Sequence, residues 1–166
     1  VALILRVQSM TDSGLAVSAL LICLWAPSVL LAGHVGVLVD RIETTRLLAG
    51  FSVFQAFVGV ALAFATPFGL MLALTALLGC GVAITQSAEF ALVPAVAGER
   101  SIQAANGMVE TARYIGFAIG PLAGGALVKV GGVTLAMLVD AGSFVVVAIV
   151  ASTLAVRRRP EPAGDG

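Results

Sequence analysis

Long apolar windows that carry few charges limit what this chain can fold into. Crossing a bilayer core of about 30 Å takes roughly 20 helical residues. Backbone polar groups must be satisfied within hydrocarbon, so such windows form helices rather than strands. The windows are a partial one at residues 1–8 and full ones at 14–39, 46–65, 69–93, 103–129 and 132–156. We therefore predict an all-α membrane protein with about five complete transmembrane helices and the end of a first one.

Composition supports a lipid environment. The 166 residues are 60% hydrophobic and 11% charged, whereas soluble domains average roughly 25% charged residues. Too few polar side chains are present to cover a soluble surface. Nine basic and nine acidic residues give a formal net charge of zero, which argues against a nucleic-acid binder. The expected partner is the lipid bilayer.

Metal sites and enzyme motifs find little support in the sequence. Cys23 and Cys80 lie inside apolar runs, where they are either small buried hydrophobes or a disulfide or metal pair. With His34 as the single histidine, soft ligands are too few for zinc. The chain has no G-x-S-x-G or H-E-x-x-H motif. We expect no metal, no cofactor and no enzymatic activity.

Basic residues predict the orientation in the membrane, because cytoplasmic loops are enriched in Lys and Arg. The loops and tail on one side of the membrane contain Arg41, Arg46, Arg100 and residues 157–159. The other side holds Arg6 and Lys129. We predict a multi-pass protein of the plasma (inner) membrane, with both ends of the intact half cytoplasmic. Residues 1–156 are expected to form a six-helix half with a truncated first helix, and 157–166 a cytoplasmic linker or tail.

The loop between the second and third windows carries a spaced motif. It reads Gly36-x-Leu38-x-Asp40-Arg41, followed by Arg46. Considered alone, the charges of this loop are also typical of a turn exposed to solvent. The spacing resembles the signature that the major facilitator superfamily carries between spans 2 and 3, G-x-L-x-D-R-x-G-R-R. The resemblance implies a conformational-switch loop made of Gly36, Asp40, Arg41 and Arg46. Glu43 replaces the usual second glycine, and Thr44 and Thr45 replace the usual basic pair.

The fifth window carries a glycine stripe. The pattern is Gly107-x8-Gly116-x3-Gly120-Pro121-x2-Gly124-Gly125. Gly116, Gly120 and Gly124 recur every four residues, so they form one ridge that permits close helix packing. Pro121 predicts a kink. A generic glycine-rich packing helix is the alternative. The whole pattern is similar to the antiporter signature of the same superfamily, which occurs in span 5 of exporters that exchange substrate for protons.

Charged residues inside the windows need partners, because an ionisable group facing lipid is costly. Glu110 and Arg113 share a helix face, and Glu89 near the end of the fourth window is a further candidate partner. They either neutralise one another or serve as proton and substrate residues. Asp140 is expected to have a hydrogen-bonding role. Further candidates for lining a cavity are Gln55, Gln86 and Tyr114.

Together the two motifs imply a function. The chain resembles the N-terminal half of a secondary transporter. The fourth window contains no arginine. Because many proton antiporters carry one there, this absence makes the chain more similar to the exporters that resemble macrolide and siderophore efflux proteins. The implied activity is proton-coupled efflux of a small hydrophobic or amphiphilic compound, with the proton gradient as the energy source. The implied partners are the small-molecule substrate and a missing C-terminal half or a second copy. The alternative is a non-transporting membrane scaffold or a dimerising half-transporter.

Overall fold

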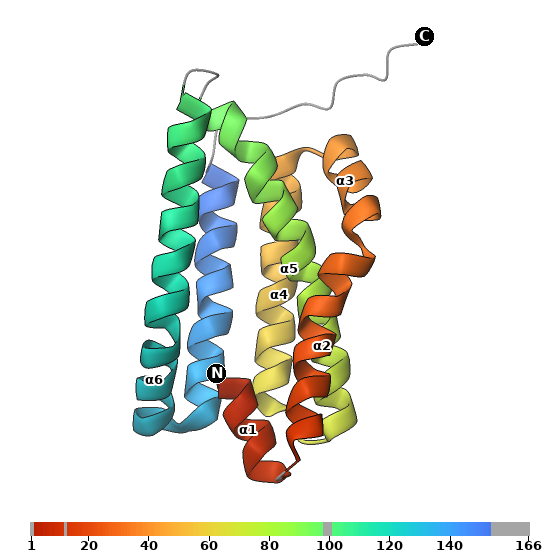
Figure 1. The fold of residues 1–166 in the computed structure, drawn as a ribbon, viewed down its shortest axis with the longest axis vertical. Coiled ribbons are helices and arrows are strands. Elements are labelled where there is room, and N and C mark those ends of the chain that lie inside the picture. The colour runs from red at the N-terminus through yellow and green to blue at the C-terminus, as the bar shows by residue number, and fades with distance from the viewer. Residues whose placement is uncertain (1, 12, 98–100, 154–166) are drawn as a thin grey trace.

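The chain forms an up-and-down bundle of helices (Figure 1). The computed structural model describes residues 2–11, 13–97 and 101–153, and the regular structure within them is helical. The elements are α1 (Ala2–Met10), α2 (Gly14–Leu30), α3 (Ala32–Arg41), α4 (Thr44–Phe64), α5 (Phe68–Ala97) and α6 (Ile102–Thr153). The all-α architecture predicted from the apolar windows is confirmed.

Helix α6 doubles back on itself at Gly132. A straight helix of its 52 residues would be roughly 78 Å long, far more than a bilayer core. Gly132 has φ 75° and ψ 177°, a backbone conformation that glycine adopts without a steric penalty from Cβ. The chain therefore turns there, and residues 102–131 (the N-terminal arm) run antiparallel to residues 133–153 (the C-terminal arm), as Figure 1 shows in green-to-teal and blue. The predicted boundary between the windows 103–129 and 132–156 lies at this turn.

The predicted single helix over 14–39 is two helices. The axes of α2 and α3 differ by 56° at a break at Leu31. Gly33 follows the break, and glycine disfavours a helix interior by roughly 1 kcal/mol relative to alanine. The bend directs α3 toward α4 and α5, so Val35 and Val39 are buried in a hydrophobic cluster. A hydropathy window cannot show this break, because both helices are apolar.

Helix α4 lies at the centre of the packing. At one end it contributes Leu47 and Leu48 to the cluster that contains Val35 and Val39. At the other end Leu62 packs with residues of α1, α2, α5 and α6. Between them Gly59 approaches the C-terminal arm so closely that a Cβ there would lie 3.1 Å from the Cβ of Ala141. The core is thus formed by α1 to α5 and the C-terminal arm, while the N-terminal arm is largely exposed.

The lengths of the helices fit a membrane protein. Thr44–Phe64, Phe68–Pro94 and the two-armed α6 are long and apolar enough to cross a bilayer, and the bent pair α2 and α3 together passes the same test. Counting the arms of α6 separately gives the five complete spans that the sequence predicts, after the short α1. Successive connections alternate between the two ends of the bundle (Figure 1).

Arg6 has a structural role that the sequence did not reveal. Its Nη1 donates hydrogen bonds to the carbonyl oxygens of Ala63, at 2.7 Å, and Leu62, at 3.5 Å. The last carbonyls of a helix lack intrahelical donors, so the guanidinium caps the C-terminus of α4. Arg46 lies at the opposite end of α4. The side chain of Arg41, and Arg100 and residues 157–159, lie outside the described residues, so the orientation in the membrane stays a prediction.

Candidate functional site: an ion cluster beside a polar cavity

Glu89, Glu110 and Arg113 form an ion cluster between α5 and the N-terminal arm. Arg113 Nη2 lies 3.7 Å from Glu89 Oε2, and Arg113 Nη1 lies 3.4 Å from Glu110 Oε1. The guanidinium carbon also lies 4.8 Å from the ring centroid of Phe90, a cation–π distance. The three charged residues singled out in the sequence are thus brought together. Phe90 was missed, although it directly follows Glu89.

The cluster carries more negative than positive charge. Two carboxylates share one guanidinium, and an arginine side chain stays protonated in proteins. The Arg113 side chain is 23% exposed, Glu89 45% and Glu110 38%, so the carboxylates remain accessible. Arg113 therefore compensates one of the two negative charges when both carboxylates are ionised.

A polar cavity of about 240 Å³ opens beside this cluster. Polar side chains from α4, α5 and α6 line it together with aromatic rings. The lining residues are Trp25, Gln55, Val82, Thr85, Gln86, Glu89, Arg113, Phe117 and Phe144. Gln55 and Gln86 were expected to line a cavity and do so. Tyr114 was expected there and is instead 68% exposed and outside this lining, because a shift of one residue from Arg113 rotates a helical side chain by about 100°.

Gln55 is the most unusual residue of the polar cavity. Its side chain is 1% exposed, and neither amide atom has a hydrogen-bond partner among the described residues. Leaving a buried donor or acceptor unpaired costs about 1–3 kcal/mol. Gly81 of α5 makes room for it, since a Cβ at Gly81 would lie 2.7 Å from Gln55 Cγ. Gln55 was only a loose candidate from the sequence, and Gly81 carried no signal there.

The glycine ridge lines a second cavity rather than a tight helix contact. Gly116, Gly120 and Gly124 border a space of about 400 Å³, which we call the glycine cavity. A Cβ at Gly107, Gly116, Gly120 or Gly125 would meet no described atom within 4 Å. Close packing at these four glycines is therefore not found within the described chain, and Gly116 and Gly120 border the glycine cavity instead.

Pro121 does not break the helix. Helical dihedral angles continue through Pro121, and the non-helical residue within α6 is Gly132. Pro121 itself lines the glycine cavity, as does Asp140 from the C-terminal arm. Phe117 lines both cavities, which are therefore neighbours.

The switch-loop residues lie around the turn from α3 to α4, at the end of the bundle where α5 ends and α6 begins (Figure 1). Glu43 occupies the N-cap position of α4, where a carboxylate is favoured by the helix dipole, and its Oε2 lies 2.8 Å from Arg46 Nε. A Cβ added at Gly36 would meet no described atom within 4 Å. Asp40 and Arg41 end α3, and their side chains lie outside the described residues.

Two departures from the superfamily signature have a physical reason. Thr44 is 2% exposed and Thr45 6%, so the usual basic pair would bury two charges in the first turn of α4. Thr45 Oγ1 lies 3.4 Å from Glu43 Oε1 and can donate to it. Thr45 thus supports the Glu43 carboxylate at the N-terminus of α4.

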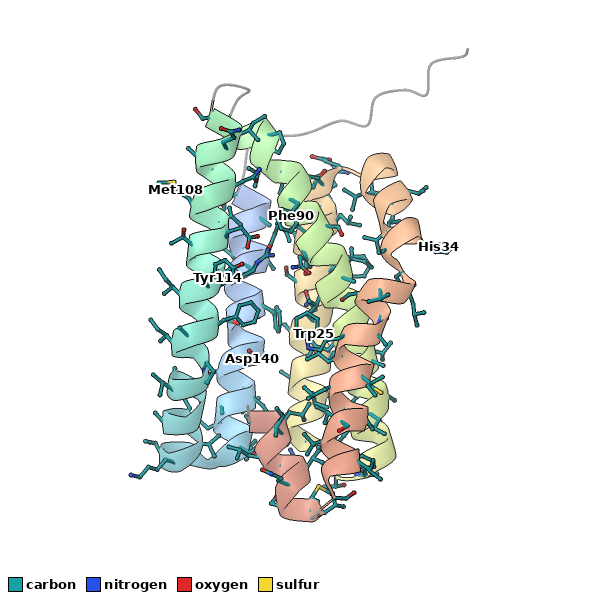
Figure 2. The ribbon with its side chains drawn as sticks, viewed as in Figure 1. Trp25, His34, Phe90, Met108, Tyr114 and Asp140 are labelled. Carbon is teal, nitrogen blue, oxygen red and sulfur yellow. The ribbon has the colours of Figure 1, made fainter. Side chains whose placement is uncertain are left out.

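Other candidates are placed away from the cavities. His34 and Met108 point away from the bundle (Figure 2). Cys23 and Cys80 are free and partly buried. Among the described residues, no group of three or more His, Cys, Asp or Glu side chains could hold a metal ion.

Membrane-length helices with cavities between them define a polytopic membrane protein. The comparison with protein families gives a match over residues 3–166 to the family described as Major Facilitator Superfamily. The chain belongs to this superfamily, whose members are transporters rather than enzymes. No curated protein and no solved structure matches the chain significantly.

Proposed function

We propose that this chain belongs to a secondary transporter that exports a small hydrophobic or amphiphilic compound in exchange for protons. The observation that carries the proposal is the ion cluster of Glu89, Glu110 and Arg113, of which Glu89 and Arg113 lie in the wall of the polar cavity. Charged groups inside a membrane protein are costly and mark ion or substrate pathways. A cluster used for packing alone would not need to border a cavity.

The charge balance of the cluster supports the proposed proton coupling. When both carboxylates are ionised, Arg113 compensates one of them and the other attracts a proton or a substrate. Protonation of either carboxylate leaves a neutral pair with Arg113. Substrate and proton would then compete for the same negative charge, which is the requirement for exchange.

The proposed movement is rocking of one helical half against another, as transporters built from repeats perform it. The turn from α3 to α4, with Gly36, Asp40, Arg41 and Arg46, would control the switch between the two states. We propose that a second six-helix half, either in a longer chain or in a second copy, closes the cavities. The proposed location is the plasma (inner) membrane, with both ends of the half cytoplasmic.

Transport in liposomes tests this proposal. A preloaded fluorescent amphiphile should leave protein-containing vesicles when a pH gradient is imposed, and Glu89→Gln with Glu110→Gln should abolish this response. The double variant Glu89→Asp with Glu110→Asp keeps both negative charges and should retain part of the response. Size-exclusion profiles of the variants in detergent serve as the control for folding.

Two results would contradict the proposal. Gradient-driven efflux that persists in the double variant would remove the ion cluster from coupling. Absence of both efflux and exchange from the unaltered protein, for a broad panel of amphiphiles, would favour the alternative of a non-transporting scaffold.

A further inference from the structure

We propose that Asp140 is a further proton-binding residue of this chain, and that its protonation allows the glycine ridge of the N-terminal arm to close the glycine cavity. This inference deepens the proposed function and rests on it for the link between the movement and transport. The movement itself requires no transport and can be measured alone.

Asp140 borders the same cavity as the glycine ridge. Its side chain comes from the C-terminal arm and lines the space of about 400 Å³ that Gly116, Gly120 and Gly124 border from the other arm. It lies about halfway along the bundle (Figure 2). Ala136 lines the same cavity, and a spacing of four residues places it on the same helix face as Asp140. Within the described lining, Asp140 is the one charged side chain.

The Asp140 carboxylate has no partner among the described residues. Ser143 donates a hydrogen bond to the backbone carbonyl oxygen of Asp140, at 2.6 Å, and not to its carboxylate. The Thr75 hydroxyl, which also lines the cavity, donates to the carbonyl oxygen of Met71 at 2.7 Å. The hydrogen-bonding role expected for this side chain from the sequence is therefore not found within the described chain.

The charged groups of the surrounding elements are engaged elsewhere. Arg6 of α1 donates to the last carbonyl groups of α4, and Arg113 of the N-terminal arm pairs with Glu89 and Glu110. Helix α2 contains no charged residue. The remaining titratable or charged side chains that the structure describes on these elements lie outside the lining of the glycine cavity: Cys23, Arg46, Cys80, Tyr114 and Lys129.

The charge of Asp140 determines whether the cavity needs water. An ionised carboxylate without a partner is costly to remove from water, and inside a membrane protein such groups face water-filled spaces or a counter-charge. The cavity of about 400 Å³ has room for roughly ten water molecules at about 30 Å³ each. The ionised form thus favours a wide, hydrated cavity. Protonation removes the charge, so the cost of losing this water falls.

The glycine ridge supplies a surface that can close. A Cβ at Gly116 or Gly120 would meet no described atom within 4 Å, so the backbone of the arm has space in front of it. Small residues let membrane helices approach closely, and Ala136 places a small side chain beside Asp140 on the C-terminal arm. Phe117 lines both cavities. Closure would therefore also move a wall of the polar cavity, which links Asp140 to the ion cluster.

Double electron–electron resonance between two spin labels tests the movement. The labels are placed at Ile22→Cys of α2 and Leu122→Cys of the N-terminal arm, in a Cys23→Ser, Cys80→Ser background. Both positions are exposed and lie outside the cavity linings. During a pH titration in detergent, the distance should be several ångströms shorter at low pH than at high pH. The control pair Ile22→Cys with Phe57→Cys of α4, also exposed, should give a constant distance.

Three variants assign the response to Asp140. Asp140→Asn has nearly the same size and carries no charge, so it should give the short distance at every pH. Asp140→Glu keeps a carboxyl group and should keep a response to pH. Glu89→Gln with Glu110→Gln should also keep the response, because the ion cluster is not the group that titrates here. Size-exclusion profiles check that each variant is folded.

The outcomes separate this switch from the proposed function. A distance that does not respond to pH, or a response that persists in Asp140→Asn, would overturn the switch. Gradient-driven efflux that is unchanged in Asp140→Asn, together with a constant distance, would overturn the switch and leave the transport function standing. A pH-dependent distance that Asp140→Asn abolishes, in a protein that moves no compound across liposomes, would support the switch and overturn the transport function.

Discussion

Arg113 connects three separate features of the interior. It pairs with a carboxylate of its own helix, with a carboxylate of α5, and with the ring of Phe90. The pair Glu110 and Arg113 could be predicted, because residues three apart in a helix share a face. The contact with Phe90 depends on how α5 and α6 are rotated against each other, and no spacing within either helix encodes that rotation.

Gly81 controls the position of Gln55, and a substitution there tests it. In Gly81→Ala the new Cβ would press on Gln55 Cγ, and overpacking of this kind costs typically about 1–3 kcal/mol. We expect a lower free energy of unfolding in detergent and a displaced amide. Combining it with Gln55→Ala should restore most of the loss, because the two side chains then share the space. If the double variant loses the sum of the single effects, the two positions do not interact.

Gly50→Ala is the matched control for that series. Gly50 is an exposed glycine of α4 with no described atom within 4 Å of a Cβ. Alanine is favoured over glycine in a helix by about 1 kcal/mol, so this variant should be as stable as the unaltered protein or more stable.

Gly79 of α5, like Gly81, lies in a close helix contact, but its neighbours are backbone atoms of α2 rather than a side chain. A Cβ there would collide with the carbonyl oxygen of Leu24 and lie 3.1 Å from that of Cys23. Small residues allow membrane helices to approach this closely, and backbone atoms cannot rotate away. Gly79→Ala should therefore destabilise by at least the roughly 1–3 kcal/mol of side-chain overpacking. Truncation with Leu24→Ala should not rescue it, and a rescue in thermal melts would contradict the backbone contact.

At the scale of elements, the sequence predicts where the membrane spans lie but little of how they pack against one another. The apolar windows predicted every complete span, because hydrocarbon enforces helix length and composition. The break at Leu31 was missed, since α2 and α3 are both apolar and a window averages across the bend. The glycine ridge was interpreted as a packing surface, whereas it borders a cavity. A smooth glycine ridge can form either a packing surface or a cavity wall, and the positions of the neighbouring helices determine which of the two it forms.

The turn in α6 depends on one residue. Gly132, at φ 75° and ψ 177°, occupies a region of backbone space that is essentially restricted to glycine and costs other residues about 1–3 kcal/mol. Gly132→Ala should lower the free energy of unfolding by this amount, measured by thermal or denaturant unfolding in detergent. Gly142→Ala in the C-terminal arm is the control, because a Cβ there meets no described atom within 4 Å. Equal stability of both variants would show that the turn tolerates a side chain.

At the scale of the whole molecule, the two neighbouring cavities are the space that a transporter would expose alternately to each side. They share Phe117 in their linings, so this ring lies between the two spaces. The described chain leaves the N-terminal arm largely exposed, and a Cβ at Gly116 or Gly120 of the glycine ridge would meet no described atom within 4 Å. This open arrangement gives the arm freedom to approach or leave the remaining helices.

Cysteine labelling at Gly116 or Gly120 tests alternating access directly. Both positions line the glycine cavity and have no described atom within 4 Å of a Cβ, so Gly116→Cys and Gly120→Cys should fold normally in a Cys23→Ser, Cys80→Ser background. A membrane-impermeant maleimide should label them in liposomes, and labelling from one side should change when the pH gradient is reversed. Gly50→Cys lies outside both linings and should give a rate that the reversal does not change. A rate at Gly116 and Gly120 that is equally insensitive would mean that the cavity does not change its access, because thiol reactivity here depends on contact with water. The same glycines that offer no close packing within the described chain would then serve as spacers of a static pore wall rather than as the surface of a moving arm.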